Sequence, residues 1–510
     1  MFLTLALLLA LYSVLTYLFK LLWIKPRRLR SRLSSQGIGG PTPSFLLGNL
    51  VEIKRSLSTT FSRKFMVKDG QVTHDWAHSL FPFLNNWAKQ YGPNYMFWAG
   101  ILPVLYLGEH DLVKEISLCT SLDLGKSTFL QKFFGPLFGQ GLLTSNGLSW
   151  AYQRKIIAPE LNLVKIKGKF SLIVESATSL ANSWESKLIS EGSEMIDIRI
   201  DEDLRRFFAD VISKACFGST YSDAKEIFVR IRALHQAMPN KSLLVGLPVL
   251  KYLPTYRNRE IWKLEKEIRM LILKVVEERR RGERQRDLLQ IIIDGADNSG
   301  LSSESATNFI VDNCKNVYLS GQGVTPMSAC WTLLLLAAHP DWQARVRDEV
   351  LEVSGGHPPN PDVLPKMKLL GMVIKEAVRL YPAFAFLSRE ALEDIKLGSI
   401  QVPKGTNIWF PILTLHRDCS LWGPDADEFC PGRFAKGVAG ACKVPQLYMP
   451  FGAGSYVCAG QHLAMTEMKI VTSLLLSKFT FSISPKYQHA PVFRLNIEPE
   501  DGVNLLVKRI

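Results

Sequence analysis

One stretch of the chain illustrates how hydrophobic and polar positions are arranged. In 261–285, charged residues surround four apolar residues that recur at helical spacing: Leu264, Ile268, Leu271 and Val275. This pattern predicts an exposed, charged helix with a single buried face. We interpret its charge as a solvated surface and not as a binding site, because charged helix faces of this kind commonly meet water.

Helical patterns fill the middle of the chain, and short strand patterns interrupt them. Strand-forming residues cluster in four segments, 95–98, 104–107, 408–410 and 502–507. Beyond residue 44 the sequence shows no internal repeat, no low-complexity tract and no composition change that would mark a second domain. The expected fold class is therefore mainly α with small β-sheets.

The first residues form a separate, apolar segment. Positions 2–24 carry Lys20 as their only charge, and this length suffices to span a bilayer. Tyr17 and Trp23 suit the membrane interface, and the positive residues of 25–32 would keep the rest of the chain cytosolic. A cleaved signal peptide would need a basic start and a small-x-small cleavage site, and neither is evident. We therefore predict an N-terminal transmembrane helix that is not removed.

Composition narrows the classes of function. The 510 residues are 47% hydrophobic, which is enough for a large core, and the net charge is +14. The basic residues are spread through helical segments and not gathered in a stripe with aromatic residues, so no nucleic-acid binding is expected. An anionic membrane and an acidic redox partner explain the positive charge better.

The cysteines are scattered, and no two of them form a CxxC pair. This spacing argues against a zinc site and against a disulfide scaffold, and it fits a reducing compartment facing the cytosol. The eight cysteines are Cys119, Cys216, Cys314, Cys330, Cys419, Cys430, Cys442 and Cys458.

One of them, Cys458, lies in the glycine-punctuated segment 450–460, directly before the amphipathic run 461–468. Glycines allow tight turns and the close approach of a large planar ligand. The free N–H groups at the start of a helix favour a thiolate over a thiol. A thiolate held in this way suits the axial position of a haem iron. A buried free cysteine without such a role is the competing interpretation.

The spacing Phe-x-x-Gly-x-x-x-Cys-x-Gly, which runs from Phe451 to Gly460, resembles the haem-binding loop of the cytochrome P450 superfamily. The resemblance implies the cytochrome P450 fold and haem b as cofactor, with Cys458 ligating the iron. Phe451 would pack beside the sulfur and the haem. Gly454 and Gly460 would supply the turn and the close entry of the next helix.

The resemblance also implies an organisation and partners. A transmembrane anchor (1–24) and a basic linker rich in proline and glycine (25–45) would precede the haem-thiolate catalytic domain (46–510). The protein would be a single-pass protein of the endoplasmic reticulum membrane, in contact with membrane lipid, with its catalytic domain in the cytosol. Electrons would come from NADPH through NADPH–cytochrome P450 reductase, which would dock on the Cys458 side.

Four residues resemble the family's contacts to the haem propionates. Trp150 and Arg154 stand at i, i+4 on one helix face, where both are hydrogen-bond donors for an anion. In cytochromes P450 the matching Trp-x-x-x-Arg holds a propionate, and so does an arginine that matches Arg389. Two residues before the cysteine the family usually has arginine or histidine. This chain has Tyr456, which donates one hydrogen bond but carries no positive charge.

A buried charge cluster is expected to brace the cysteine loop. Glu376 and Arg379 are i, i+3 neighbours in a helix, and in the family such a pair is locked by a later arginine, here Arg433. The glutamate commonly found before that arginine is Gly432, so one outer contact is expected to be missing. The role is structural, because breaking such a pair leaves a buried charge without a partner.

The long helical run 306–340 resembles the central helix that crosses the oxygen-binding face of the haem. The family writes its oxygen groove as Ala/Gly-Gly-x-Asp/Glu-Thr-Thr/Ser, whereas this chain has Gly323 at the acid position and Val324 at the usual alcohol. Thr325 keeps a hydroxyl. Pro326 opens the helix further, because proline has no N–H for the carbonyl four residues earlier.

Three interpretations of this groove stay open, and Gly321, Gln322 and Thr325 are its candidate catalytic residues. It belongs to a partly impaired enzyme, or to a working monooxygenase that uses Gln322, Thr325 and water in place of the carboxylate. The third interpretation is a rearranged site with haem-thiolate chemistry but without ordinary oxygen activation.

Several phrases are similar to plant cytochromes P450 of the clan that contains gibberellin (diterpenoid) oxidases. They stand at 143–147, 155–160, 213–218 and 484–491. This branch implies a diterpenoid, a triterpenoid or a similarly bulky, hydrophobic small substrate. Phe384, Phe386 and Leu387 are apolar where the family lines its pocket, and core packing explains them equally well.

The predicted function is that of a haem-thiolate monooxygenase that inserts oxygen into a bulky apolar metabolite of the terpenoid type. One alternative is an enzyme of the same fold that isomerises, cyclises or dehydrates its substrate without net oxidation, because Gly323 and Val324 replace the acid/alcohol pair. A second alternative is a non-catalytic binder of haem or another ligand, which so many departures from the family pattern together would suit.

Overall fold

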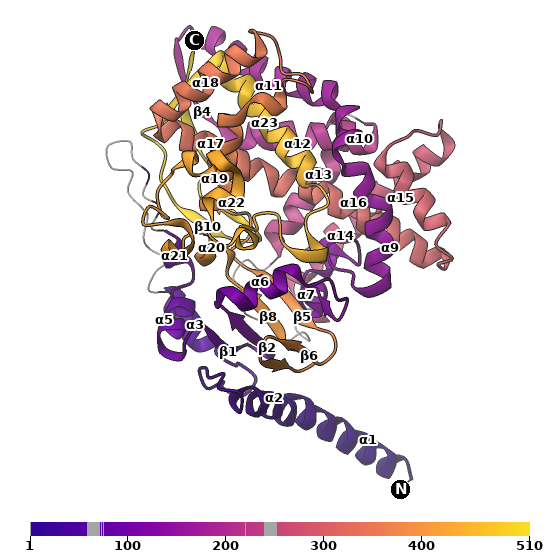
Figure 1. The fold of residues 1–510 in the computed structure, drawn as a ribbon. Coiled ribbons are helices and arrows are strands. Elements are labelled where there is room, and N and C mark those ends of the chain that lie inside the picture. The colour runs from indigo at the N-terminus through magenta and orange to yellow at the C-terminus, as the bar shows by residue number, and fades with distance from the viewer. Residues whose placement is uncertain (1, 59–71, 73, 75, 220, 239–251) are drawn as a thin grey trace.

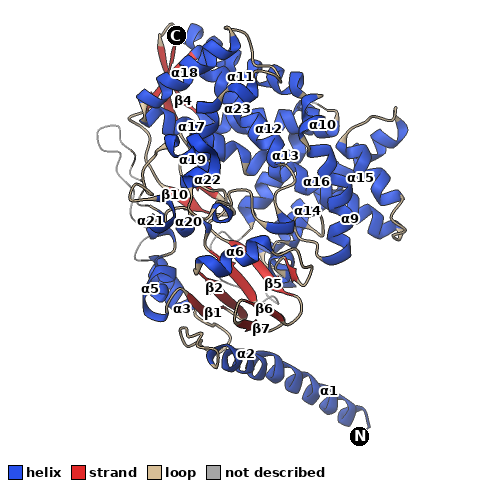
Figure 2. Cartoon of the chain, in the orientation of Figure 1, coloured by secondary structure: helices blue, strands red, loops and turns tan. Residues whose placement is uncertain are grey.

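A large helical body and a smaller sheet-rich part make up the molecule, and the N-terminal helices project from the sheet-rich end (Figures 1 and 2). The computed structural model describes residues 2–510 except 59–71, 73, 75, 220 and 239–251. Helices dominate it and the sheets are small, so the predicted fold class is confirmed.

The helices up to the centre of the chain are α1 (Phe2–Phe19), α2 (Lys25–Ser34), α3 (Leu50–Ser58), α4 (Ala77–Leu80), α5 (Pro82–Tyr91), α6 (His110–Leu118), α7 (Thr128–Phe133), α8 (Gly135–Phe138), α9 (Gly147–Ile157), α10 (Leu163–Lys167), α11 (Phe170–Glu191), α12 (Ile200–Phe217) and α13 (Tyr221–Ala237). The later helices are α14 (Tyr256–Arg281), α15 (Leu288–Asp297), α16 (Ser303–Gly323), α17 (Thr325–Ala338), α18 (Pro340–Ser354), α19 (Lys368–Leu380), α20 (Ile412–Leu415), α21 (Cys419–Trp422), α22 (Gly437–Ala441) and α23 (Gln461–Lys478).

Among the described residues the strands form four small sheets, and the largest has the order β1-β2-β8-β5-β3. All four predicted strand segments lie in or overlap strands. Tyr95 and Tyr106 face each other across β1 and β2 with stacked rings 4.6 Å apart, a cross-strand pair that favours this register. The strands are β1 (Asn94–Ala99), β2 (Leu102–Leu107), β3 (Leu124–Gly125), β4 (Met195–Arg199), β5 (Leu387–Ala391), β6 (Ile395–Leu397), β7 (Ile400–Val402), β8 (Asn407–Phe410), β9 (Phe479–Ile483), β10 (Pro491–Phe493), β11 (Ile497–Pro499) and β12 (Asn504–Arg509).

A three-stranded sheet joins distant parts of the chain in the order β4-β12-β9. The central strand β12 pairs antiparallel with both neighbours. Beyond the strands, the backbone N–H of Ile200 donates to the carbonyl of Val503 at 2.9 Å, and Asp201 accepts from the N–H of Val503 at 3.1 Å. The start of α12 is thereby fixed to the segment before β12.

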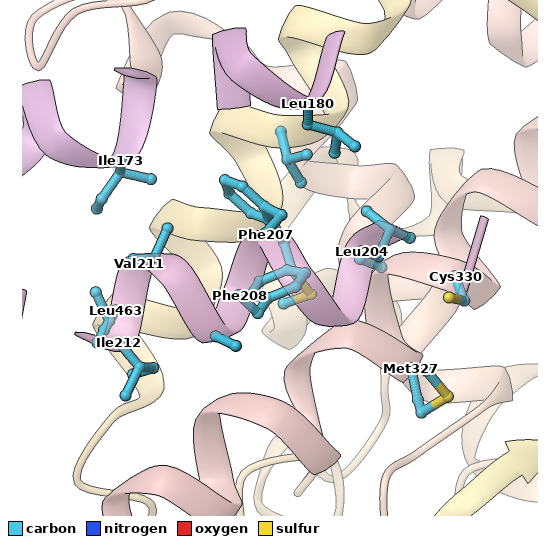
Figure 3. Close-up of a cluster of buried hydrophobic side chains, with 14 of the residues drawn as sticks. Ile173, Leu180, Leu204, Phe207, Phe208, Val211, Ile212, Met327, Cys330 and Leu463 are labelled. Carbon is cyan, nitrogen blue, oxygen red and sulfur yellow. The ribbon is translucent and has the colours of Figure 1, made fainter. Parts of the chain in front are cut away.

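Helix α12 runs through the core of the helical body, and Figure 3 shows part of the cluster around it. The labelled side chains come from α11 (Ile173, Leu180), α12 (Leu204, Phe207, Phe208, Val211, Ile212), α17 (Met327, Cys330) and α23 (Leu463). Burial of so much apolar surface holds α12 against the two helices that matter for the site, α16 and α17.

The charged helix predicted at 261–285 is α14, which begins at Tyr256 and ends at Arg281. Its apolar stripe is buried as expected, but the deepest residues after Ile268 are Ile272 and Val276, each one position later than predicted. The expected positions follow steps of four, three and four residues, whereas the buried ones after Leu264 follow a constant step of four. Because a helix has 3.6 residues per turn, such a row runs obliquely along its surface.

The N-terminal segment folds as α1, a single π-helical turn (Lys20–Ile24) and α2. Trp23 in this turn contacts Phe45 with ring centres 5.3 Å apart, and the guanidinium of Arg27 lies 3.9 Å from the Trp23 ring. Within the part of the chain that the structure describes, no helix combines the length and the apolar character that crossing a membrane requires.

Candidate functional site

Cys458 ends a tight loop that begins at Phe451 and leads into α23. The backbone N–H of Cys458 donates to the carbonyl of Phe451 at 2.8 Å and closes this loop. Gly454 has φ +66°, and a Cβ there would lie 2.9 Å from the carbonyl oxygen of Cys119. Gly460 has φ −91°, and nothing that the structure describes lies within 4 Å of a Cβ built there. Of the two glycines, the surrounding protein requires Gly454.

The sulfur of Cys458 lies within the protein body and also borders open space. Its side chain is accessible, yet the protein atoms around it are numerous enough that burial raises the pKa of the thiol. The backbone N–H of Gly460 and the charge of Arg154 oppose this rise, because both favour the thiolate. Arg154 is held in place by donating from Nη1 to the carbonyl of Val457 at 2.6 Å.

Aromatic rings and cations gather beside the cysteine loop. The rings of Trp150 and Tyr456 are tilted against each other with centres 4.4 Å apart. Lys126 Nζ lies 5.0 Å from the centre of the Tyr456 ring and 5.7 Å from that of Trp150. The guanidinium of Arg389 lies 5.0 Å from the centre of the Tyr456 ring. The structure therefore brings together Trp150, Tyr456 and Arg389, with Arg154 on the same helix as Trp150.

The basic side chains of this group are not matched by acidic ones that the structure describes. Among the described residues, no carboxylate pairs with Lys126, Arg154 or Arg389, and the acceptors that these three side chains reach are backbone carbonyls. Burial lowers the pKa of Lys126 to about 6, with Arg389 and Arg154 adding to the effect, and burial lowers the pKa of Arg389 to about 10. The Tyr456 hydroxyl is buried without a hydrogen-bond partner in the described part of the chain. These residues fit a ligand with two anionic groups, such as the propionates of haem.

Lys126 is the residue of this group that the sequence did not reveal. It stands at the junction of β3 and α7, where neither helical nor strand periodicity marks a functional position. Asn146, directly before α9, accepts from the Lys126 backbone N–H at 2.7 Å and donates to its carbonyl at 2.8 Å. This exchange places the lysine beside Trp150, and it becomes apparent only when the two segments are adjacent.

The structure also brings Glu376, Arg379 and Arg433 together, and we call these three residues the charge brace. Arg379 donates to both carboxylate oxygens of Glu376, at 2.7 and 2.9 Å, and Arg433 donates to one of them at 3.0 Å. The side chains of Glu376 and Arg379 are 0% exposed. Arg379 also donates to the carbonyls of His416, Ala426 and Glu428. Every charge in the brace is thus paired, as buried charges require.

Asp425 supplies an outer contact at the position where Gly432 lacks a side chain. The carboxylate of Asp425 lies 3.1 Å from Nη2 of Arg433, which also donates to the Asp425 carbonyl at 2.9 Å. The backbone N–H of Cys430 donates to Glu376 at 2.8 Å. The segment before the cysteine loop is therefore fastened to α19 in spite of Gly432. Sequence reasoning missed Asp425, because a single aspartate in a loop carries no periodic signal.

His416 connects the charge brace to the cysteine loop. Its Nε2 accepts from the backbone N–H of Met449 at 3.1 Å, and its Nδ1 lies 3.2 Å from the carbonyl of Arg379. Burial lowers the pKa of His416 to about 3, and the charge of Arg379 adds to this effect. The neutral form, with the proton on Nδ1, satisfies both contacts.

The long helix predicted at 306–340 is divided, and we call residues 322–326 the helix junction. Val324 stands between α16 and α17, and Pro326 occupies the first turn of α17. The N–H groups of Met327 and Ser328 both donate to the carbonyl of Val324, at 3.2 and 3.3 Å. The prediction that Pro326 opens the helix is confirmed, and the chain restarts its helix at the junction.

Two side chains from distant segments bind two of the carbonyls that the junction leaves without helical partners. Nη1 of Arg205, on α12, donates to the carbonyl of Gln322 at 3.2 Å. Nδ2 of Asn496, in the turn between β10 and β11, donates to the carbonyl of Gly323 at 3.1 Å. Neither residue was recognised in the sequence.

The glycines of the groove differ in their surroundings. A Cβ on Gly321 would lie 2.1 Å from Cγ1 of Ile212 on α12, so a glycine is needed there for the close packing of the two helices. A Cβ on Gly323 would meet nothing that the structure describes within 4 Å. Gly321 and Gln322 thus make their contacts toward α12, and Thr325 is half-buried at the start of α17.

The structure places the three candidate pocket residues in different surroundings. Phe386 belongs to an aromatic group in which its ring is stacked on Trp409 at 4.3 Å and lies 5.7 Å from both Phe81 and Phe493. Leu387 starts β5 and is half-buried, whereas Phe384 is 38% exposed. The aromatic group around Phe386 is the closely packed part of this region, and we call it the aromatic wall.

Comparison with known proteins agrees with the geometry. The family model described as cytochrome P450 matches residues 63–504. Cytochrome P450 714C2 of Oryza sativa subsp. japonica is 48% identical over 500 residues, which cover 97% of this chain and 96% of the relative. Cytochrome P450 714B3 of Zea mays is 45% identical over 501 residues (97% and 93%), and cytochrome P450 714A2 of Arabidopsis thaliana is 43% identical over 492 residues (94% and 93%).

Proposed function

The chain belongs to the cytochrome P450 family, and on this premise we propose that it oxidises a bulky, apolar metabolite of the terpenoid type. Membership makes the protein a haem-thiolate monooxygenase, an oxidoreductase. The similarity to plant relatives along nearly the whole chain supports the substrate class, and so does the aromatic wall around Phe386 and Phe493.

The observation that carries the assignment of the site is the unbalanced positive charge beside Cys458. Lys126, Arg154 and Arg389 would hold the propionates of haem, with Trp150 and Tyr456 as further donors. A propionate beside Lys126 would favour the protonated amine that burial disfavours, so Lys126 would then supply the positive charge that Tyr456 lacks. Haem with a thiolate ligand supplies the activation of dioxygen.

The remaining residues are proposed to position the cysteine loop and to hold a water in the groove. The charge brace keeps the segment before the cysteine loop in place, so the sulfur of Cys458 stays at the start of α23. Thr325 offers a hydroxyl and Gln322 an amide at the helix junction, where the family usually has an acid and an alcohol. These two groups would hold the proton-donating water in the groove.

We further propose that the protein is anchored in the endoplasmic reticulum membrane and receives electrons from NADPH–cytochrome P450 reductase. The apolar sequence of 2–24 and the basic residues of 25–32 support the anchor. Exposed lysines on α9 and α10, Lys155 and Lys167, give the surface near α23 a positive charge suited to an acidic partner. Extraction of membranes with alkaline carbonate should leave the full chain in the pellet and release a chain that lacks 1–24.

The decisive experiment is expression of the full chain with a reductase in a host that produces terpenoids. We expect a product heavier than its precursor by one oxygen atom, dependent on NADPH and on Cys458. A Cys458→Ala variant that forms the same product would overturn the proposal, and so would a haem-loaded protein that turns over none of the terpenoids.

A non-oxidative reaction is the second candidate, and the altered helix junction favours it. Gly323 and Val324 remove the carboxylate and the alcohol that usually deliver protons, and Pro326 divides the helix there. Omitting the reductase and NADPH separates the two candidates. Turnover that continues without them, with no change in substrate mass, supports isomerisation or cyclisation, whereas a mass loss of one water supports dehydration.

Restoring the family pair tests the same point from the protein side. The double variant Gly323→Glu, Val324→Thr returns a carboxylate and a hydroxyl to the groove. In a partly impaired monooxygenase it should raise the amount of product formed per NADPH consumed. Loss of activity in this variant, with the haem retained, would instead indicate that the junction of this chain is functional as it stands.

A further inference from the structure

We infer that Arg205 and Asn496 are positioning residues that set the shape of the oxygen groove by holding the helix junction open. This role deepens the proposed monooxygenase function, on which its activity readout rests. We call these two side chains the junction clamp.

The helical hydrogen bonds that the backbone loses at the junction include those accepted by the carbonyls of Gln322 and Gly323. In an unbroken helix, the carbonyl of Gln322 would accept from residue 326 and that of Gly323 from residue 327. Pro326 has no N–H, and the N–H of Met327 donates to Val324 instead. Two carbonyls in a half-buried region are therefore left without helical partners, and leaving such groups unpaired is costly.

The clamp pairs both carbonyls from outside the helix. Arg205 reaches the carbonyl of Gln322 from α12 at 3.2 Å, and Asn496 reaches that of Gly323 from the β10–β11 turn at 3.1 Å. Asn496 is 2% exposed and the side chain of Arg205 is 15% exposed, so water competes weakly for either contact. These bonds come from two directions and fix the end of α16 against separate elements.

A charge network holds the clamp itself in place. Nη2 of Arg205 lies 3.3 Å from the carboxylate of Glu498 and 3.4 Å from the sulfur of Met327. Glu498 also accepts from Arg494 at 2.9 Å. The network therefore orients the guanidinium from β11, on the same hairpin that carries Asn496. The clamp joins α12 and the hairpin at the junction.

The same hairpin connects the clamp to the substrate side. Phe493, at the end of β10, lies 5.4 Å from Phe81 and 5.7 Å from Phe386, in the aromatic group that forms the candidate pocket wall. Asn496 follows it in the turn of the hairpin. One hairpin therefore contacts both the aromatic group, through Phe493, and the carbonyl of Gly323, through Asn496.

The test compares neighbouring arginines on one helix. Arg205→Met removes a clamp member, and Arg206→Met is the matched control because Arg206 is 69% exposed and its carboxylate contact is 3.9 Å long. Hydrogen exchange of the amides of Met327 and Ser328 should become at least ~10-fold faster in Arg205→Met, as expected for a lost buried hydrogen bond, and should not change in Arg206→Met. This measurement needs no substrate and no turnover.

The activity readout is the ratio of product formed to NADPH consumed. Arg205→Met and Asn496→Leu should lower this ratio roughly 5-fold while the spectral shift on substrate binding is retained, since the loss of one hydrogen bond, about 1 kcal/mol, corresponds to such a factor. The reduced-CO spectrum checks the proposed function separately. If the unmodified protein lacked the band typical of a thiolate-ligated haem, the haem-thiolate assignment would be refuted. The exchange result would then decide the role of the clamp by itself.

Rescue distinguishes positioning from general destabilisation. Pro326→Ala restores an N–H at 326, which lets the carbonyl of Gln322 accept within the helix. In this background Arg205→Met should have a much smaller effect on exchange and on the product ratio. Equal effects with and without Pro326 would overturn the inference, as would unchanged exchange in folded Arg205→Met. If Arg205→Met does not fold, Asn496→Leu and Arg205→Lys, which keeps the charge near Glu498, decide the same question.

Discussion

The two regions that flank the candidate site are stabilised by different means. Around the cysteine loop, the charge brace concentrates three ionised side chains that are at most 7% exposed, and each is paired with another charge. At the helix junction the backbone itself is interrupted, and neutral carbonyls are bound by Arg205 and Asn496. The charges of the brace satisfy one another. The junction, in contrast, needs side chains from α12 and from the turn between β10 and β11.

This difference predicts where substitutions act. A change in the brace leaves a buried charge unpaired and should weaken the whole cysteine loop. A change at the junction alters one or two hydrogen bonds and should affect the groove while the protein stays folded. Substitutions in both regions test this contrast, from the largest expected effect to the smallest.

The largest effect is expected at Cys458, where both regions serve the same ligand. Cys458→Ala removes the sulfur, so the reduced-CO Soret band typical of a thiolate-ligated haem should disappear completely. Cys419→Ala is the control, because Cys419 is also accessible but lies on α21. A band of unchanged position in Cys458→Ala would refute the ligand assignment.

The brace should respond next most strongly. Glu376→Gln leaves Arg379 and Arg433 without their shared carboxylate, at an expected cost of about 3–5 kcal/mol in the free energy of unfolding. Glu393→Gln is the control: the pair that Glu393 forms with Lys404 is 2.8 Å long but 62% exposed on the Glu393 side, and its loss should cost less than ~1 kcal/mol. Thermal inactivation of the two variants measures the difference, and similar midpoints would contradict the importance of the brace.

A matched pair of glycines sharpens the contrast within the groove. Gly321→Ala places a methyl group against Ile212 and should destabilise the protein by about 1–3 kcal/mol. Gly323→Ala meets open space and should be neutral or stabilising by up to ~1 kcal/mol, because alanine favours the helix. Denaturant unfolding compares them. If Gly323→Ala destabilised the protein as much as Gly321→Ala, the described packing of α16 on α12 would be wrong.

The smallest effect near neutral pH is a pH dependence that originates in the brace region and grows as the pH falls. The folded-state pKa of His416 is about 3, below its ordinary value of 6.5, because burial and the nearby charge of Arg379 disfavour the proton. Between these two pH values the unfolded chain binds the proton and the folded chain does not. Stability should therefore fall as the pH is lowered from 6.5 toward 3, by at most about 1.4 kcal/mol per pH unit for this histidine.

The variant His416→Gln should show a flatter pH profile of the unfolding midpoint. His489 is also buried with a pKa lowered to about 3, so part of the slope should persist. His357→Gln is the control, because His357 is exposed. Identical profiles for His416→Gln and the unmodified protein would exclude His416 as a source of the acid sensitivity.

The sequence was sufficient for features that repeat or that stand at fixed spacing. The fold class follows from periodicity, and the four strand segments were recognised because strand-forming residues cluster there. The break at Pro326 followed from the missing N–H of proline, which acts locally whatever the surroundings. The family followed from the spacing around Cys458, and the comparisons confirmed it.

Contacts between distant segments could not be predicted in this way. Lys126, Asp425 and Arg205 each act through a partner far away in the sequence or in a different loop, and nothing in their immediate neighbours marks them. Gly321 and Gly323 look alike in the sequence, and only the position of Ile212 distinguishes them. The roles assigned to the haem contacts and to the pocket residues stay predictions until the variants are measured.

The order of strands in the sheet β4-β12-β9 has a consequence for synthesis. β12 lies between two strands that emerge from the ribosome before it, one of them (Met195–Arg199) far earlier in the chain. Until Asn504–Arg509 has been translated, β4 and β9 each present an open edge that invites wrong pairing. The start of α12, and with it Arg205, is secured only when β12 has been made. A nascent chain of this protein is therefore expected to need chaperone cover until β12 is available for pairing.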